Sequence, residues 1–227
     1  MSSRKLTILV DVDDTIENLL DAWCEWLNRE YNTSFTADKV TEWDLTQKFT
    51  PLTHEQIISP LSLPEFWDTV MPKPGAQAAL IKMMDDGHEV YLVTASHYDT
   101  YKPKIEHMIN RCFWFIDYDH IICTSNKKLI KGDLIIDDGA HNLGTTPGIL
   151  FDAPHNRGVD AEDVNAIRLY TWEQIYDYVC QIAEAEPNSI FDPLFKEIYD
   201  MEHTVYSALT TFRNAVETFC DEKGGFD

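Results

Sequence analysis

Basic residues are scarce in this chain of 227 residues: 18 Lys and Arg face 39 Asp and Glu, which gives a formal net charge of −21 at pH 7. A balance this acidic argues against binding to nucleic acid or to an anionic membrane surface, because both need basic patches. The charge also repels phosphorylated ligands at long range. A site for such a ligand therefore needs a cation close to it.

Cysteines are few, and long apolar runs are absent. The five cysteines have no C-x-x-C spacing and are odd in number, which favours reduced thiols in a cytoplasmic protein over a disulfide framework. No apolar run approaches the roughly 20 residues of a membrane-spanning helix. The first strand is expected within a few residues of Met1, which leaves no room for a signal peptide. We therefore expect a cytoplasmic protein without a membrane span.

The most informative segment is an apolar run that ends in acidic residues. Residues 6–10 are aliphatic except for Thr7, as in a strand buried on both faces, and they lead directly into Asp11, Asp13 and Asp14. Carboxylates so close together repel one another and lose hydration, so they persist only near a positive charge. Oxygen ligands favour Mg²⁺ over zinc. One Asp after a strand is ordinary turn chemistry, but acids at alternate positions indicate a functional site.

Three later apolar segments also end in polar side chains. They lead into Thr94, into Lys127 and Lys128, and into the pair Asp137 and Asp138. In an open parallel sheet the carboxyl ends of the strands line one crevice, so these side chains are expected to converge. Acids, a hydroxyl and a lysine together suit a phosphate group held by a metal ion.

At these residues the chain resembles the haloacid dehalogenase superfamily of phosphohydrolases. Residues 11–15 are similar to its first motif, DxDx(T/V), Thr94 to its second, Lys127 to its third and Asp137-Asp138 to its fourth. Within the superfamily, two segments resemble the core sequence of the 5'(3')-deoxyribonucleotidases, the cytosolic type C 5'-nucleotidases: residues 132–138 and 149–156. The resemblance covers about residues 5–180.

The resemblance implies a phosphomonoesterase that works through an aspartyl-phosphate. Asp11 would be the nucleophile, and Asp13 would protonate the leaving oxygen and then activate water. The metal ligands would be Asp11, the backbone carbonyl of Asp13 and Asp137, with Asp138 holding a metal-bound water. The implied cofactor is Mg²⁺.

The resemblance also implies the groups that bind phosphate. These are Thr94, the backbone N–H of Ala95 and Lys127, with Lys128 as an alternative to Lys127. The chain departs from the family at two positions. Asp14 stands where many members have glycine, and Ala95 stands where the nucleotidases tend to have serine.

Strands that alternate with helical segments predict an α/β fold: a Rossmann-like parallel sheet with helices on both faces. The expected core comprises residues 1–15 and 74–186, and residues 16–73 form an inserted helical cap. Residues 187–227 are expected to be a helical extension, because apolar residues recur there at steps of three and four. Packing on the core, closure over the cap and pairing into a homo-oligomer are the alternatives for this extension.

Substrate choice is expected to lie in the cap, which is rich in aromatic residues and poor in basic ones. Such a surface suits stacking of a neutral nucleobase. Phe66 and Trp67, near the return to the core, and Trp43 are the expected contacts. The alternative is that these aromatics form the interior of a small helical cap.

The sequence therefore predicts a Mg²⁺-dependent phosphatase, most specifically a 5'(3')-deoxyribonucleotidase acting on nucleoside monophosphates. A phosphatase of sugar phosphates or other small metabolites is the nearest alternative. A phosphate-binding protein of the same fold without turnover is another. Asp13 argues against that last alternative, because a binding protein has no use for an acid–base residue.

Overall fold

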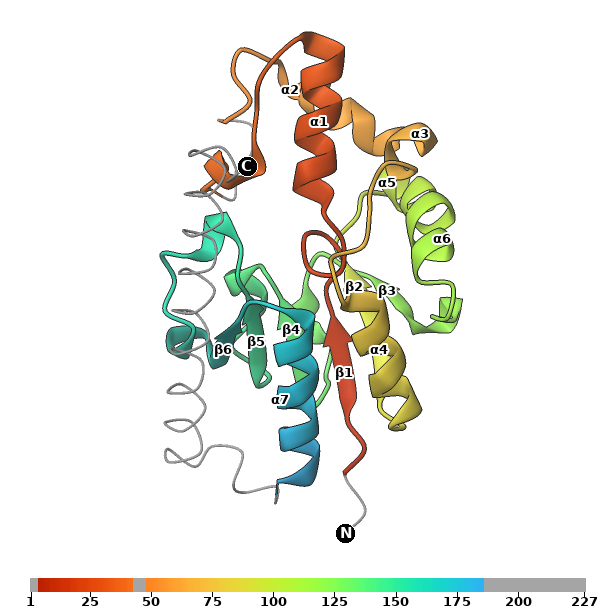
Figure 1. Ribbon diagram of the computed structural model, residues 1–227, viewed down its shortest axis with the longest axis vertical. Coiled ribbons are helices and arrows are strands. Elements are labelled where there is room, and N and C mark those ends of the chain that lie inside the picture. The colour runs from red at the N-terminus through yellow and green to blue at the C-terminus, as the bar shows by residue number, and fades with distance from the viewer. Residues whose placement is uncertain (1–3, 43–47, 186–227) are drawn as a thin grey trace, which may run out of the picture. The chain divides into compact units, whose positions relative to one another are not determined.

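The computed structural model describes residues 4–42 and 48–185. The first of the chain's two compact units, residues 1–183, contains a six-stranded parallel sheet in the order β3-β2-β1-β4-β5-β6 (Figure 1). The strands are β1 (Thr7–Val10), β2 (Glu89–Thr94), β3 (Ile121–Cys123), β4 (Leu134–Asp137), β5 (Gly148–Phe151) and β6 (Ala166–Leu169). The predicted α/β fold with a parallel sheet is confirmed. The helices predicted within residues 187–227 lie outside the described residues.

The central strands are short apolar segments because they are covered on both faces. β4 and β5 are buried along their whole length, and β1 is buried after its first residue. Aliphatic side chains lose no hydrogen bonds on such burial. Val10 of β1 is paired with Leu92 of β2 and with Ile136 of β4. The three strands therefore end at the same edge of the sheet.

Helices and loops cover the sheet. Figure 1 shows α4 (Ala76–Asp85) and α7 (Trp172–Glu184) in front of it. One sheet face packs, through Leu9 and Ile135, against loop and 3-10 residues that include Leu143 and Ala161. Trp172, at the start of α7, donates a hydrogen bond to the backbone oxygen of Thr15 at 3.0 Å. This contact fixes the loop that follows β1.

A continuous helical stretch follows β2 and changes geometry along its length. It consists of α5 (Tyr98–Pro103), a π-helical turn η4 (Lys104–Ile109) and α6 (Asn110–Cys112). Pro103 has no backbone N–H to donate, and from there the helix continues in π geometry. π-helical turns are rare and are frequent at functional sites.

Residues 16–73, which we call the cap, contribute a second group of helices. Figure 1 shows α1, α2 and α3 beyond the carboxyl ends of the strands. The described elements of the cap are α1 (Leu19–Tyr31), η1 (Ala37–Lys39), α2 (His54–Ile58), η3 (Ser59–Ser62) and α3 (Pro64–Trp67).

The two connections between core and cap run antiparallel to each other. Glu17 and Pro72 form an isolated β-bridge, Asn18 N–H donates to the oxygen of Met71 at 2.9 Å, and Lys73 N–H donates to that of Ile16 at 2.9 Å. The two ends of the cap are therefore tied to each other where they join the core.

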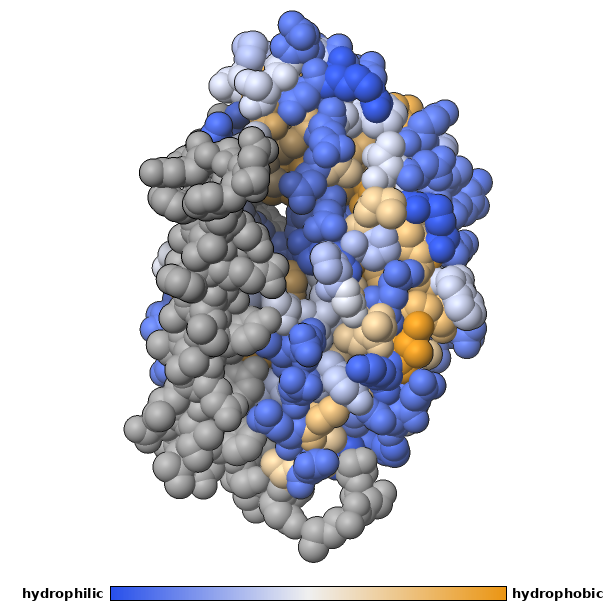
Figure 2. All heavy atoms as spheres, viewed as in Figure 1, coloured by the Kyte–Doolittle hydropathy of each residue, from blue (hydrophilic) through white to orange (hydrophobic). Residues whose placement is uncertain are grey.

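The visible surface agrees with the acidic composition. Figure 2 shows hydrophilic residues over most of this face, with a smaller apolar group over α4, where Ile81 is 38% exposed. No helix among the described residues has both the length and the apolar character needed to cross a membrane.

Candidate active site

Three carboxylates meet where β1 and β4 end. Asp11 follows β1 and donates its N–H to the oxygen of Ile136 at 2.8 Å, while Asp137 closes β4 and Asp138 follows it. One oxygen from each carboxylate lies within 4.8 Å of the other two, and all three residues are buried. Parallel strands that end in register thus bring Asp11 together with two acids that lie 126 and 127 positions further along the chain.

Lys127 is the cation of this cluster. Its Nζ donates to Asp11 Oδ1 and, at 2.8 Å, to Asp137 Oδ2. Burial acts to lower the pKa of Lys127, but the charges of Asp11 and Asp137 outweigh it and raise the pKa above its usual value. Lys128 is exposed. Of the two lysines considered from the sequence, Lys127 is the one that the structure places at the acids.

One lysine does not balance the cluster. Burial raises the pKa values of Asp11 and Asp137, Lys127 lowers them, and the neighbouring carboxylates raise them again. A further positive charge would relieve this repulsion. Three clustered oxygen donors with no sulfur or nitrogen form a donor set that fits a hard divalent cation.

Other side chains hold the acids in place. Asp137 accepts from Gly139 N–H at 2.7 Å and from Asn142 Nδ2 at 3.0 Å. Thr15 Oγ1 lies 3.4 Å from Asp11 Oδ2 and 3.4 Å from Asp138 Oδ1. These contacts orient the three carboxylates toward one point, as expected for groups around a ligating site.

Asp138 also contacts His155 and Asn156, which follow β5. His155 Nε2 lies 3.2 Å from Asp138 Oδ2, and Asn156 Nδ2 donates to the backbone oxygen of Asp138 at 2.9 Å. Burial acts to lower the pKa of His155, but Asp138 raises it above its usual value. His155 therefore adds positive charge beside the acids when it is protonated.

A second cluster, which sequence reasoning missed, surrounds Lys104. Its Nζ donates to Asp13 Oδ2 at 2.7 Å and to Thr94 Oγ1 at 3.0 Å, and the lysine is 2% exposed. A signal was present: Lys104 lies on the apolar stripe of its helix with the buried residues Ile105 and Met108. A lysine on a buried stripe needs an acidic or polar partner.

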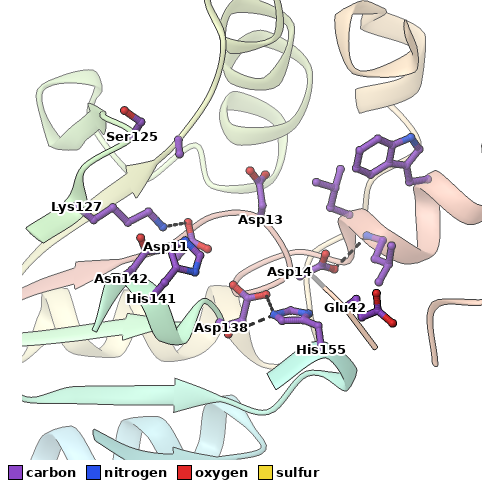
Figure 3. Close-up of a pocket in the computed structure, with 14 residues that line it drawn as sticks. Asp11, Asp13, Asp14, Glu42, Ser125, Lys127, Asp138, His141, Asn142 and His155 are labelled. Carbon is purple, nitrogen blue, oxygen red and sulfur yellow. Dashed lines mark hydrogen bonds and ion pairs between the residues drawn. The ribbon is translucent and has the colours of Figure 1, made fainter. Parts of the chain in front are cut away.

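The pocket above the acids has a polar end and an apolar end (Figure 3). Leu19, Leu20 and Trp23 of α1 form the apolar wall. The polar lining consists of Asp11, Asp13, Asp14, Glu42, Ser125, Lys127, Asp138, His141, Asn142 and His155, and Ala95 also contributes to the lining. Asp14 lies between the two ends. Burial raises its pKa to about 7, although Lys73 opposes the shift.

The predicted aromatic contacts in the cap lie elsewhere. Phe66 and Trp67 are 0% and 1% exposed, do not line this pocket, and pack on each other with ring centres 5.4 Å apart. The prediction that they face a ligand is therefore corrected: a small helical cap needs large side chains for its own interior. Trp43 lies outside the described residues.

Two solved structures share this fold at low sequence identity. A predicted phosphatase from Clostridium acetobutylicum has a TM-score of 0.55 and 14% identity, and the match covers 79% of this chain and all of that one. A HAD family hydrolase from Deinococcus radiodurans, solved with bound phosphate and sodium, has a TM-score of 0.52 and 13% identity over 82% of this chain and all of that one. The fold is that of the haloacid dehalogenase hydrolases.

The sequence comparisons define the family more narrowly. The chain belongs to the family described as "5' nucleotidase, deoxy (Pyrimidine), cytosolic type C protein", whose model matches residues 4–185. A 5'(3')-deoxyribonucleotidase of Bacillus subtilis is 35% identical over 176 residues, which are 75% of this chain and 96% of that protein. One of C. acetobutylicum is 32% identical over 68% of this chain and 86% of its own length. The predicted family and the prediction of a phosphatase are confirmed.

Proposed function

We propose that the protein is a Mg²⁺-dependent 5'(3')-deoxyribonucleotidase that hydrolyses nucleoside monophosphates through an aspartyl-phosphate. The observation that carries the proposal is the buried cluster of Asp11, Asp137 and Asp138 with Lys127, next to a pocket that Asp11, Lys127 and Asp138 line. The names of the relatives support the nucleotide as substrate.

Asp11 is the nucleophile. Its carboxylate lines the pocket and is held by Lys127 and Thr15, so an oxygen can attack phosphorus while the ester oxygen leaves. Water then cleaves the aspartyl-phosphate and releases inorganic phosphate. Lys127 stabilises the negative charge that the carboxylate and the phosphoryl group share.

Mg²⁺ would be held by Asp11, Asp137 and the backbone oxygen of Asp13, with Asp138 holding a metal-bound water. The bound ion would screen the nucleophile from its anionic target and stabilise the charge of the transition state. Asn142 and Gly139 fix the Asp137 carboxylate for this role.

Asp13 is the general acid and then the general base. Its Oδ2 accepts from Lys104, whereas its Oδ1 is buried and has no hydrogen-bond partner within the described part of the chain. No described protein group competes for that oxygen, so it would take the leaving oxygen of the substrate and afterwards water as its partner. An Asp two positions after the nucleophile projects into the same pocket.

Four groups bind the phosphoryl oxygens: the Thr94 hydroxyl, the backbone N–H of Ala95, and the ammonium groups of Lys127 and Lys104. Lys104 donates to Asp13 and Thr94, so one of its three N–H groups remains for a phosphoryl oxygen. The nucleoside then lies along Leu19, Leu20 and Trp23. This apolar wall suits a neutral base better than a second phosphate.

A hydrolysis screen tests the proposal. Nucleoside monophosphates, sugar phosphates and p-nitrophenyl phosphate are compared in Mg²⁺ and in EDTA. We expect nucleoside monophosphates to have the highest kcat/KM, with activity lost in EDTA. Sugar phosphates as the better substrates would contradict the nucleotidase, and full activity in EDTA would contradict the metal.

A further inference from the structure

We propose that Trp67 of the cap is a positioning residue for the phosphate site: the face of its indole ring holds Lys104 against Asp13 and Thr94. The inference rests on the proposed function, which assigns Asp13 and Thr94 their roles. In this role a cap residue affects the hydrolysis of every phosphomonoester, whatever group the phosphate is attached to.

The contacts of Lys104 define this role. Its Nζ lies 5.1 Å from the centre of the Trp67 ring, 2.7 Å from Asp13 Oδ2 and 3.0 Å from Thr94 Oγ1. The lysine side chain is 3% exposed. An ammonium group is attracted to the face of an indole ring, and the attraction is stronger when both are withdrawn from water. The ring thus adds a favourable contact for the ammonium beside its two hydrogen-bond acceptors.

Trp67 is itself fixed in place. It is 1% exposed, its Nε1 donates to the oxygen of Leu61 at 2.7 Å, and its backbone oxygen accepts from Arg111 Nη2 at 3.1 Å. Arg111 also donates to the oxygen of Val70 at 2.6 Å. The ring cannot turn toward the pocket without breaking its bond to Leu61, and the Arg111 bonds fix the backbone that carries the ring.

The same helical stretch therefore contacts the end of α3 and the residues just after it at three points. Lys104, on the π-helical turn η4, lies under the ring of Trp67, and Arg111, on α6, binds the carbonyls that follow it. Between them, His107 Nδ1 lies 3.0 Å from Asp68 Oδ1. The position of the cap is in this way coupled to the ammonium group that touches the general acid.

A stacking role and a positioning role of Trp67 predict different losses of activity when this residue is replaced. If Trp67 stacked on a base, Trp67→Leu would impair nucleotides only. If it positions Lys104, the variant impairs every phosphomonoester and weakens binding of inorganic phosphate. Phe66→Leu is the matched control, because Phe66 is an equally buried neighbour on α3, and among the described residues the cation–ring contact of Lys104 is to Trp67 and not to Phe66.

The experiment measures kcat and KM with a nucleoside monophosphate and with p-nitrophenyl phosphate, and the inhibition constant of inorganic phosphate. We expect Trp67→Leu to lower kcat/KM about three- to thirtyfold on both substrates and to raise the inhibition constant similarly. Trp67→Phe, which keeps a ring face, is expected to restore most of the loss. Loss on the nucleotide alone, equal losses in Phe66→Leu, or no rescue by phenylalanine would each overturn the proposal.

A double-mutant cycle tests whether Trp67 acts through Lys104. In the Lys104→Met background, Trp67→Leu is expected to have no further effect, and a full additional loss would overturn the proposal. If Trp67→Leu does not fold, the smaller effect of Trp67→Phe enters the cycle instead. If the wild type hydrolyses no phosphomonoester, the proposed function fails. Calorimetric binding of inorganic phosphate to wild type and variants then tests the role of Trp67 separately.

Discussion

Lys127 and Lys104 are both buried beside carboxylates of the site, but their partners differ in access to water. Lys127 binds Asp11 and Asp137, whose side chains are 7% and 0% exposed, whereas Lys104 binds Asp13, whose side chain is 30% exposed. Removing one partner of a buried pair leaves an uncompensated charge, but a partly exposed carboxylate can be hydrated instead. The Lys127 cluster should therefore matter for both folding and chemistry, and the Lys104 cluster chiefly for chemistry.

The two lysines also reach the site by different routes. Lys127 lies in the short turn η6 (Lys127–Leu129) that follows β3, so it reaches the site from the core. Lys104 lies on a helix that packs against α3 of the cap, and its position depends on how cap and core meet. The cap can thus influence Asp13 without touching Asp11.

The largest expected effects on turnover come from replacing Asp11 and Asp13, and the two substitutions should differ in which substrates they slow. Asp11→Asn should abolish turnover of every phosphomonoester, because an amide cannot form the aspartyl-phosphate. Asp13→Asn should slow a nucleoside monophosphate about 10²- to 10⁴-fold. It should slow p-nitrophenyl phosphate far less, since that leaving group needs little protonation. Measured kcat values decide, and equal losses of Asp13→Asn on both substrates would remove Asp13 from the acid role.

Replacing Lys127 and replacing Lys104 should lower the free energy of unfolding by different amounts. Lys127→Met is expected to lower the free energy of unfolding in EDTA by about 3–5 kcal/mol, because Asp11 and Asp137 stay buried without a cation. Lys104→Met should cost about 1 kcal/mol or less, because water reaches Asp13. Urea denaturation measures both, with the exposed Lys128→Met as the control. Equal costs for the two lysines would contradict the comparison.

Stabilisation by Mg²⁺ should depend on the Lys127 cluster more than on the Lys104 cluster. With Mg²⁺ at about 100 times its dissociation constant, the free energy of unfolding should rise by about 2.7 kcal/mol. Asp137→Asn should lose this gain, because it removes a ligand carboxylate. Asp13→Asn should keep most of it, because only the backbone oxygen of Asp13 is assigned to the metal. Thermal unfolding with and without EDTA gives the answer, and a gain that survives Asp137→Asn would refute the ligand assignment.

The last expected effect concerns Glu17, at the junction of core and cap. Its side chain is fully buried, and neither of its carboxylate oxygens has a hydrogen-bond partner among the described residues. Burial raises the pKa of Glu17, and the charges of Asp13 and Asp14 raise it further. A raised folded-state pKa penalises the native state once the pH exceeds the value in the unfolded chain, because the unfolded chain then loses its proton first.

Glu17→Gln should therefore stabilise the protein by about 1–3 kcal/mol at pH 7 to 8, since an amide does not ionise and the native state no longer carries the penalty of the raised pKa. The gain should shrink toward pH 4, where the glutamate is protonated in both states. Unfolding curves across this pH range measure the effect. A gain that does not depend on pH would show that the charge of Glu17 is not its cause.

Much of the site was predictable because it follows the strands. Asp11, Thr94 and Asp137 each come at or directly after the end of a strand, and parallel strands end at one edge. Lys104 was missed because a helix carries it, and no strand end marks its position. The roles of Phe66 and Trp67 were misjudged because composition does not tell an aromatic in the interior of the cap from one that faces a pocket.

The sequence by itself determined which polar groups meet at the edge of the sheet, since apolar runs and the residues that follow them depend only on local order in the chain. It also determined that the site needs a cation, because clustered carboxylates repel one another wherever they lie. Only the tertiary structure decided that Lys104 joins Asp13, that Trp67 covers that lysine, and that α1 supplies the apolar wall. These features arise where cap and core pack together, and such packing depends on the shapes of surfaces that are distant in the chain.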